Sequence, residues 1–382
     1  MVSPGVPVDA APLQQARVLG EKVIGEIELA AAFFPGTIVA ITGSNGKTTT
    51  TTLAGEVIAN GGFSVAVGGN IGTPAISLVD TATDDTIAVL EVSSFQLETI
   101  QNFRPRIAVV LNVTPDHLDR HRTFAVYTDA KARIFENQGP DDFVVFNADD
   151  PTCVGLAKRT HSQVFWFSRK KEVEQGAYVR DARILFRDGN GQKEIMLVSD
   201  ITLKGAHNLE NVLAAVCVGA LSDVQPARIR KAVHEFHAVE HRLEFVASVR
   251  GVDYYNDSKA TNVDATIKAL ESFPANIHLI LGGKDKGSDY TVLNDLLRER
   301  VKRVYTIGTA AAKIESQIEG TEIVHAETLE NAVRLASESA QARDVVLLAP
   351  ACASFDQFRS YEHRGKVFKE AVKALAAAEV KV

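Results

Sequence analysis

A glycine loop close to the N-terminus constrains the fold of this chain more than any other feature. The β-rich run Ile38–Ile41 passes directly into it, and a stretch compatible with a helix follows as far as Asn60. The loop reads Thr42-Gly43-Ser44-Asn45-Gly46-Lys47-Thr48-Thr49. A strand, a glycine loop and a helix in this order are the context of a phosphate-binding loop. The sequence therefore predicts a site for phosphate groups.

Each part of this loop suits phosphate chemistry. Glycines let backbone N–H groups approach phosphate oxygens, and the N-terminus of the next helix favours negative charge. Lys47 is expected to neutralise β and γ oxygens and the Thr48 hydroxyl to bind magnesium, which predicts ATP with Mg²⁺. Two residues separate Gly43 from Gly46, where the usual Walker pattern has four. A glycine turn that opens a helix for packing alone is the other interpretation, which the Lys-Thr pair in register disfavours.

The composition excludes several other classes of protein. The 382 residues exceed the usual size of one hydrophobic core, so two or three domains are expected. A net charge of −7 gives no footprint for nucleic acid or anionic membrane, and no run is apolar enough for a membrane span. The three scattered cysteines suggest neither a disulfide framework nor a zinc site. We expect a cytoplasmic monomer that binds small molecules.

Apolar runs alternate with amphipathic stretches after Gly36, which predicts a parallel α/β sheet. The expected buried strands are Thr37–Thr42, Ser64–Val67, Ile87–Leu90 and Ile107–Leu111. After Phe143 the runs become short and are separated by turn signals, which predicts antiparallel hairpins appended to the parallel core. These runs are Val164–Phe167, Ala177–Arg180, Ile184–Phe186 and Glu194–Val198.

A second α/β series begins near Leu243. Its expected strands are Ile277–Leu281, Val304–Ile307 and Val345–Leu348, and they follow helices at Asn208–Leu221 and Pro226–Phe236. We place a domain boundary between His237 and Glu240. The predicted fold is α/β, with a central P-loop domain (residues 26–239) whose parallel sheet carries antiparallel strands, and a C-terminal Rossmann-like α/β domain (residues 240–382).

Polar side chains follow two of the predicted strands. Glu91 ends the run Ile87–Leu90 and should emerge at the carboxyl edge of the sheet, close to the phosphate loop, where a magnesium ligand is expected. Asn112 ends the next strand, and Asp116-His117-Leu118-Asp119 follows it. Magnesium prefers oxygen ligands, so His117 is an unusual candidate, and such a pair in a loop is also common as a surface hydrogen bond.

Four ordered motifs together resemble the Mur ligases of bacterial cell-wall synthesis. They are Thr42–Thr49, Gly68–Gly72, Glu91–Glu98 and Asn112–Arg120. The resemblance continues through Gly205–Asn208, Glu240–Glu244, Asn256–Asn262 and Pro350–Phe358. The last two motifs most resemble those of family members that add D-glutamate to UDP-N-acetylmuramoyl-L-alanine in peptidoglycan precursor synthesis. This resemblance implies that ATP converts the substrate carboxylate into an acyl phosphate, which the amine of D-glutamate attacks.

The resemblance also implies roles for individual residues. Lys47 would hold the phosphates, Thr48 and Glu91 a first magnesium ion, and His117 a second one together with a carbamylated Lys131. The residues implied for ATP are Gly43, Ser44, Asn45, Gly46, Lys47, Thr48, Thr49, Asn208, Arg242 and, at the ribose, Asp257. Those implied for the substrates are Ser3 and Asn70 for the muramoyl-alanine side, and Lys259, Thr261, Lys286, Ser354 and Tyr361 for D-glutamate.

The chain departs from the family pattern in three places. Tyr361 stands where relatives tend to have phenylalanine, and Lys284 adds a second cation beside Lys286. The N-terminal UDP-binding domain of the family is almost wholly absent. Residues 1–25 resemble a remnant of it, in which Ser3–Pro7 would be the last substrate-facing loop. Weak or absent ligation by this polypeptide on its own is therefore expected.

Two other functions remain open on the sequence alone. A ligase similar to folylpolyglutamate synthase would share the phosphate loop and the acyl-phosphate route, but Asp257–Asn262 and Pro350–Phe358 argue against it. A non-catalytic ATP-binding module would follow from the missing domain. Such a module would have no need of His117 and Lys131, so the expected set of site residues argues for an enzyme.

Overall fold

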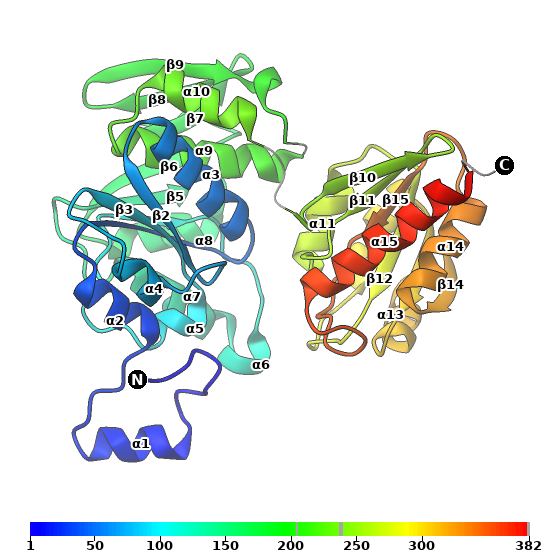
Figure 1. Ribbon diagram of the computed structural model, residues 1–382, viewed down its shortest axis with the longest axis horizontal. Coiled ribbons are helices and arrows are strands. Elements are labelled where there is room, and N and C mark those ends of the chain that lie inside the picture. The colour runs from blue at the N-terminus through cyan, green and yellow to red at the C-terminus, as the bar shows by residue number, and fades with distance from the viewer. Residues whose placement is uncertain (204, 237–239, 380–382) are drawn as a thin grey trace. The chain divides into compact units, whose positions relative to one another are not determined.

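The computed structural model describes residues 1–203, 205–236 and 240–379. They form two compact units, one from residues 1–203 and 207–236 and the other from residues 205–206 and 240–379 (Figure 1). The boundary expected between His237 and Glu240 lies for the most part outside the described residues. In the ranges that are described, no helix combines the length and the apolar character needed to cross a membrane.

The first unit contains a nine-stranded sheet with the order β2-β3-β1-β4-β5-β6-β7-β8-β9. The strands are β1 (Thr37–Thr42), β2 (Ser64–Gly69), β3 (Thr86–Glu91), β4 (Ile107–Val110), β5 (Phe143–Asn147), β6 (Gln163–Ser168), β7 (Gly176–Arg180), β8 (Arg183–Asp188) and β9 (Gly191–Leu197). All pairs from β2 to β7 are parallel, whereas β7, β8 and β9 form antiparallel hairpins. The predicted fold class, a parallel sheet with appended antiparallel strands, is confirmed.

One predicted pairing is wrong. The run Val164–Phe167 is expected in an antiparallel hairpin, but β6 pairs parallel with both β5 and β7. The prediction assigns no strand to β5, because the change of pattern begins at Phe143. With helix α8 (Pro151–Leu156) between them, β5 and β6 form one more β-α-β crossover, and such crossovers produce parallel neighbours.

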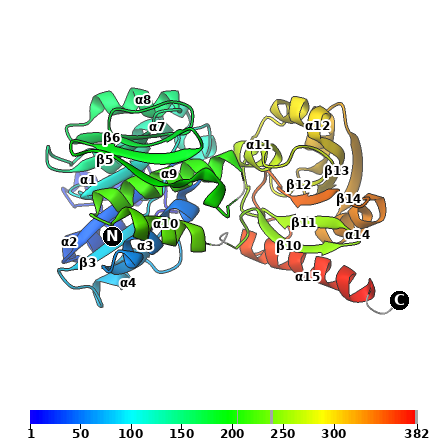
Figure 2. The ribbon, with the colours of Figure 1, turned by 90° about the horizontal axis from the view of Figure 1, so that it is seen from above.

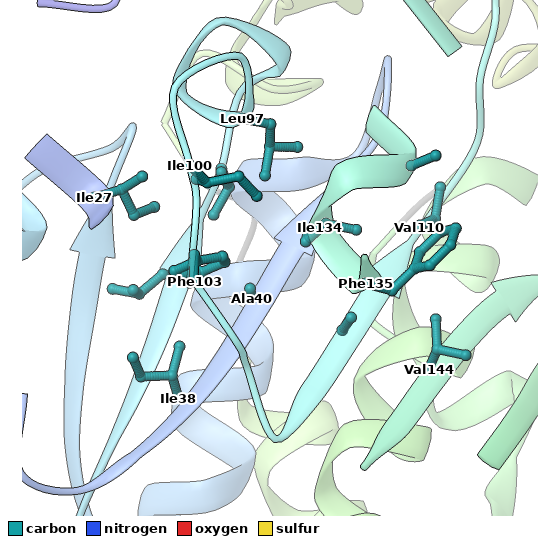
Figure 3. Close-up of a cluster of buried hydrophobic side chains, with 14 of the residues drawn as sticks. Ile27, Ile38, Ala40, Leu97, Ile100, Phe103, Val110, Ile134, Phe135 and Val144 are labelled. Atoms are coloured by element: carbon teal, nitrogen blue, oxygen red, sulfur yellow. The ribbon is translucent and has the colours of Figure 1, made fainter. Parts of the chain in front are cut away.

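The helices of the first unit are α1 (Ala11–Val18), α2 (Glu26–Phe33), α3 (Lys47–Asn60), α4 (Ala75–Val79), α5 (Ser94–Leu97), α6 (Leu118–His121), α7 (Phe124–Ala132), α8, α9 (Ala206–Leu221) and α10 (Pro226–Glu235). Most of them cover the two faces of the sheet, but α1 has no buried residue and stands away from it (Figure 1). Alternate residues of a strand point to one face, so Ile38 and Ala40 of β1 share a core cluster with Ile27 of α2, Leu97 of α5 and Phe135 (Figure 3). This apolar core holds the strands rigid beneath the loops at their carboxyl ends.

The second unit contains a six-stranded sheet with the order β10-β11-β15-β12-β13-β14. Its strands are β10 (Glu244–Val249), β11 (Val252–Asn256), β12 (Ile277–Gly282), β13 (Val301–Ile307), β14 (Glu322–Glu327) and β15 (Val345–Leu348). β10 is antiparallel to β11, and the other pairs are parallel. The strands predicted at 277–281, 304–307 and 345–348 are therefore present, as expected for an α/β domain.

The helices of the second unit form a layer on each face of its sheet. They are α11 (Val263–Glu271), α12 (Asn294–Arg300), α13 (Ala311–Gln317), α14 (Leu329–Ser339) and α15 (Tyr361–Glu379). One core cluster includes Leu270, Leu297 and Ile314 of α11, α12 and α13. The other includes Leu329 of α14 and Phe368 of α15, which lie on the opposite face (Figure 2). The sheet is thus covered on both sides, as parallel sheets require.

A buried carboxylate ties α2 to the segment that leads into β4. Glu28 is 6% exposed, and its oxygens accept the backbone N–H groups of Gln101, Asn102 and Phe103 at 2.8 to 3.0 Å. Hydrogen bonds to an ionised acceptor are stronger than neutral ones. The carboxylate therefore satisfies three donors of a turn that has no regular secondary structure of its own.

We expect Glu28→Ala to lower the free energy of unfolding of the first unit by about 2 kcal/mol, because it leaves backbone donors without their acceptor. Urea unfolding followed by circular dichroism measures the change. Glu56→Ala is the matched control, since Glu56 is an exposed glutamate on α3. A loss no larger than in the control would contradict the anchoring role.

Candidate active site

Four loops of the first unit converge at the carboxyl edge of its sheet. β2, β3, β1 and β4 are neighbours in the sheet, and all four run parallel. Their carboxyl ends lead into Asn70, Glu91, the phosphate loop and Asn112 respectively. The parallel arrangement thus brings together side chains that the sequence keeps far apart.

The phosphate loop is held in shape by Asn112. The Asn112 amide accepts the N–H of Asn45 at 2.9 Å and donates to the Asn45 carbonyl at 3.1 Å, while its own carbonyl accepts the N–H of Ser44. Gly46 lies in the left-handed region at φ 83°, and a Cβ there would come within 2.3 Å of Asn211. A side chain at this position would therefore displace the loop or the helix behind it.

Lys47 curls back over the same loop. Its Nζ donates to the carbonyls of Gly43 at 2.8 Å and Ser44 at 2.9 Å. These carbonyls are neutral acceptors, so a phosphate oxygen would be a stronger partner for the ammonium group. The side chain is thus already at the place where a triphosphate would meet the N-terminus of α3.

Glu91 is the centre of a buried group of oxygen atoms. It is 2% exposed, and its Oε2 accepts the Thr48 hydroxyl at 2.7 Å. Its Oε1 accepts the side-chain amide of Asn70 at 2.9 Å. A carboxylate and a hydroxyl in contact at the end of a phosphate loop suit a hard cation such as Mg²⁺, which prefers oxygen ligands.

His117 directly precedes helix α6 as its N-cap and has left-handed backbone geometry, at φ 53°. Its N–H donates to Asp116 Oδ1 at 2.9 Å, and its Nε2 lies 3.6 Å from Asp116 Oδ2. The ring also meets the ring of Phe95 with 4.9 Å between centroids. The Asp-His pair of the sequence is therefore a pair in space as well, and about a third of the histidine side chain is exposed.

Lys131 lies beneath the phosphate loop, on α7. It is 1% exposed, its Nζ donates to the Gly43 carbonyl at 2.8 Å, and it lies 4.7 Å from the centre of the Tyr127 ring. Burial, and secondly the charge of Lys47, hold the pKa of the Lys131 amine well below its usual range. The amine is therefore much closer to its neutral, nucleophilic form than a surface lysine.

Two further residues of this edge were not identified from the sequence. The Tyr127 hydroxyl lies 3.1 Å from the Ser44 hydroxyl, which also donates to the Thr114 carbonyl. The buried His121 lies with Nε2 3.0 Å from the Ser94 hydroxyl and with Nδ1 3.5 Å from Glu98. Tyr127 stands four residues before Lys131 on the same helix, and this spacing is the signal that could have found it.

Two further predicted residues of the first unit, Asn208 and Ser3, lie on α9 and in the N-terminal segment. Asn208 of α9 accepts a hydrogen bond from Asn211 at 3.1 Å, and Asn211 in turn accepts one from Thr50 of α3 at 3.2 Å. Ser3 is exposed, in an N-terminal segment that Arg120 of α6 holds through the Val6 carbonyl at 2.9 Å. Asn208 is thus linked to the helix that follows the phosphate loop, and the Ser3 segment to α6.

In the second unit, Arg242 and Asp257 lie near the end of β11. Asp257 is 8% exposed and accepts the N–H of Leu243 at 3.3 Å. Burial raises the pKa of Asp257 to about 6, while the positive charge of Arg242 opposes this rise. The two residues predicted for the nucleotide are therefore electrostatic neighbours.

The residues predicted for D-glutamate gather at the carboxyl edge of the second sheet. Lys259 and Thr261 follow β11, Lys286 follows β12, and Ser354 follows β15, all on neighbouring strands. Tyr361 begins α15, and the Lys259 ammonium lies 5.1 Å from the centre of its ring. Of the two cations considered after β12, Lys284 is exposed and Lys286 is half-buried. The edge thus offers cations and hydroxyls to an anionic ligand.

Comparisons with known proteins agree along nearly the whole chain. Residues 41–219 match the family described as Mur ligase middle domain, and residues 241–352 match Mur ligase, glutamate ligase domain. A protein of Koribacter versatilis named UDP-N-acetylmuramoylalanine--D-glutamate ligase is 67% identical over 381 residues, which cover 100% of this chain and 84% of that protein. One of the same name from Acidobacterium capsulatum is 57% identical over 377 residues, covering 98% and 82%.

Solved structures show the same architecture. The MurF ligase of Thermotoga maritima, determined in complex with ADP, superposes with a TM-score of 0.71. The match covers 91% of this chain and 83% of that one at 19% identity. At this identity the likeness concerns the fold alone.

We expect Asn112→Ala to weaken the binding of ATP with magnesium about tenfold, because the phosphate loop loses the two side-chain hydrogen bonds that hold it. Isothermal titration with a non-hydrolysable ATP analogue measures the affinity. Asn137→Ala is the control, since Asn137 also donates to two backbone carbonyls, Gln101 and Phe103, but at the amino end of β4. Equal affinities of the two variants would contradict the role of Asn112.

Proposed function

The chain belongs to the Mur ligase family, and from this premise we propose that it is an ATP-dependent ligase that adds D-glutamate to UDP-N-acetylmuramoyl-L-alanine. The observation that carries the proposal is the 67% identity, along the whole chain, to a ligase named for this reaction. The product is a precursor of peptidoglycan. Each unit by itself supports the proposal, because the first offers a phosphate loop with a buried carboxylate and the second offers a set of cations and hydroxyls.

The reaction has two steps. The γ-phosphoryl group of ATP passes to the carboxylate of the first substrate, which gives ADP and an acyl phosphate. The neutral amine of D-glutamate then attacks the acyl carbon, the C–O bond to phosphate breaks with its electron pair, and the amine loses a proton as the amide forms. A carboxylate and an ammonium group do not condense in water without such activation, so clamping the phosphoryl charge is the main task of the protein.

Lys47 takes the central part in this task. In our proposal its ammonium group leaves the carbonyls of Gly43 and Ser44 for the β and γ phosphate oxygens. Backbone N–H groups of the loop Gly43–Thr49 supply further donors at the N-terminus of α3. Asn208 is proposed to contact the nucleotide as well, with Arg242 and, at the ribose, Asp257.

Magnesium, when bound, neutralises charge on the transferred phosphoryl group. We propose that Thr48 and Glu91 hold one ion and that His117 and a carbamylated Lys131 hold a second. The first pair fits such an ion, because its buried hydroxyl and carboxylate oxygens lie 2.7 Å apart. A lysine ammonium does not fit a cation site, whereas the carbamate formed when a neutral amine adds CO₂ supplies oxygen ligands.

The substrates are assigned to the remaining predicted residues. We propose that Asn70 and Ser3 contact the muramoyl-alanine substrate. Asn70 donates to Glu91 through its amide nitrogen. D-Glutamate is assigned to the second unit, to Lys259, Thr261, Lys286, Ser354 and Tyr361. Cations and hydroxyls of this kind suit a dicarboxylate.

These assignments imply a division of the chain by task. Residues 26–239 would bind the phosphates of ATP, and residues 240–382 would bind the amino acid and, through Arg242 and Asp257, part of the nucleotide. Residues 1–25, together with Asn70, would contribute to contacts with the UDP-linked substrate. We further propose that the protein acts as a monomer in the cytoplasm, where ATP and nucleotide-linked precursors occur.

We expect phosphate release from ATP only when magnesium, UDP-N-acetylmuramoyl-L-alanine and D-glutamate are all present. The assay is run on this chain and on a form that includes any coding sequence upstream of it. Lys47→Met should abolish release, and Lys158→Met, at an exposed lysine of the same unit, should not change it. Release with L-glutamate and a folate would indicate a folylpolyglutamate-type ligase. ATP binding without release in both forms would indicate a binding module.

We expect the Lys131 side chain to carry a carbamate at neutral pH in bicarbonate. Because burial lowers the pKa of its amine, a larger share of it is neutral and able to add CO₂ than in a surface lysine. Carbon-13 NMR with labelled bicarbonate should show a carbamate signal that is absent in Lys131→Met but present in Lys158→Met. A spectrum of the parent protein without that signal would contradict the modification.

A further inference from the structure

Arg364 is the largest side chain that is fully buried in the described part of the chain. It lies in the first turn of α15, three residues after Tyr361, and is 0% exposed. Arginine is rarely buried completely, because removing a guanidinium group from water is costly unless its donors are satisfied. The question is therefore what this residue does behind the edge of the second sheet.

The guanidinium group joins two loops that the sequence keeps far apart. Its Nε donates to the Ser258 hydroxyl at 3.0 Å and its Nη2 to the Ser258 carbonyl at 2.8 Å. It also donates to the carbonyls of Cys352 at 3.1 Å and Ala353 at 3.4 Å. Ser258 directly precedes Lys259, and Ala353 directly precedes Ser354. Arg364 thus holds the backbone on which the proposed D-glutamate residues stand.

The same turn fixes the start of α15. The Ser258 hydroxyl donates to the Tyr361 carbonyl at 2.8 Å, so Ser258 connects Arg364 to the residue whose ring faces Lys259. The next residue, Gly365, packs so closely that a Cβ would come within 2.2 Å of His241. Both loops and the helix start therefore meet at Arg364.

The guanidinium of Arg364 is in no direct ion pair with a carboxylate among the described residues, although the negative charge of Asp356 acts on it from farther away. Within the described residues, no aspartate or glutamate oxygen lies within the 4.0 Å of an ion pair with its guanidinium, and all its partners are carbonyl or hydroxyl oxygens. Burial lowers the pKa of Arg364 to about 10, which still leaves the group protonated at neutral pH. A buried positive charge, partly offset by the negative charge of Asp356, thus lies behind an edge that is proposed to receive a dicarboxylate.

We propose, on the basis of the ligase function above, that Arg364 is a positioning residue for the amino-acid substrate. Its guanidinium holds the Ser258–Thr261 and Cys352–Ser354 loops at a fixed separation and adds a buried positive charge behind them. It does not touch the substrate. The residues that do are set in place by it.

The experiment is steady-state kinetics of phosphate release, in the form of the protein that shows D-glutamate-dependent activity. Arg364→Lys keeps the charge but has fewer donors, and Ser258→Ala removes one acceptor and leaves the charge untouched. We expect both variants to raise KM for D-glutamate about tenfold, because each loses hydrogen bonds to a charged group, while KM for ATP stays within about twofold. Arg364→Met, which also removes the charge, should raise KM for D-glutamate further.

Arg300→Lys is the matched control. Arg300 lies in the same unit and donates to the backbone carbonyls of Glu271 and Phe273, but at the amino end of β13. This variant should keep the parent KM for D-glutamate. Thermal unfolding of every variant separates a folding defect from a kinetic one, and Ser258→Ala provides the mildest change should Arg364→Met fail to fold.

The outcomes are distinct. A parent protein without D-glutamate-dependent release overturns the proposed function itself. A parent that is active, with Arg364→Lys and Ser258→Ala both at the parent KM for D-glutamate, overturns the positioning role alone. Equal increases of KM for ATP and for D-glutamate also overturn it, since they indicate a general loss of structure. A rise confined to D-glutamate supports it.

Discussion

The convergence of parallel strand ends is the constraint on which the rest of this structure depends. Parallel neighbours leave all their carboxyl ends at one edge, and the crossover helices return the chain to the other. In the first unit this edge receives Asn70, Glu91, the phosphate loop and Asn112 from four neighbouring strands. In the second unit, the carboxyl ends of the parallel strands β11, β15 and β12 likewise lie at one edge of the sheet. Apolar cores lie beneath these edges and support the loops. The polar side chains of the sites are therefore separate from the apolar side chains of the cores.

Electrostatics at the first edge are organised around one carbonyl oxygen. Lys47 and Lys131 each donate to the Gly43 carbonyl at 2.8 Å, one from the loop itself and one from beneath it. Two ammonium groups on one neutral acceptor repel each other, and Lys47 is the second cause, after burial, of the low pKa of Lys131. A triphosphate would draw Lys47 away and relieve that repulsion. The two lysines therefore have different roles: Lys47 would move to the triphosphate, and Lys131 is the buried amine with the low pKa. The sequence alone does not distinguish them.

The sequence predicted several buried strands well, but it missed buried β5 and β11 as well as exposed β14. β1, β3 and β12 are continuous apolar runs, which is the pattern of a strand covered on both faces. β14, from Glu322 to Glu327, has a single buried residue and no apolar run, so no pattern distinguishes it from a loop. The predicted pairing direction of β6 was wrong for a different reason. It depends on a crossover through α8, which is a tertiary feature and not a property of the run itself.

Among the site residues, too, a sequence motif identifies some and does not identify others. Lys47, Thr48 and Glu91 stand in contiguous motifs, whereas the polar residues that hold the loops have partners far along the chain. Asn112 also stands in a motif, but its contact with Asn45 spans 67 residues, and Arg364, which stands in none of the motifs, binds Ser258 across 106 residues. No local pattern records such a pair.

The hydrogen bonds that Asn112 and Arg364 make to these loops explain why these side chains are polar. A loop that ends a strand carries backbone groups that the sheet does not satisfy, and ordering it costs conformational entropy. An amide or guanidinium side chain that satisfies several such groups at once offsets both costs, provided that all its own donors and acceptors are used. An apolar replacement would fill the space but leave the loop without partners. The geometry of both edges therefore depends as much on buried residues that contact no ligand as on the residues exposed above them.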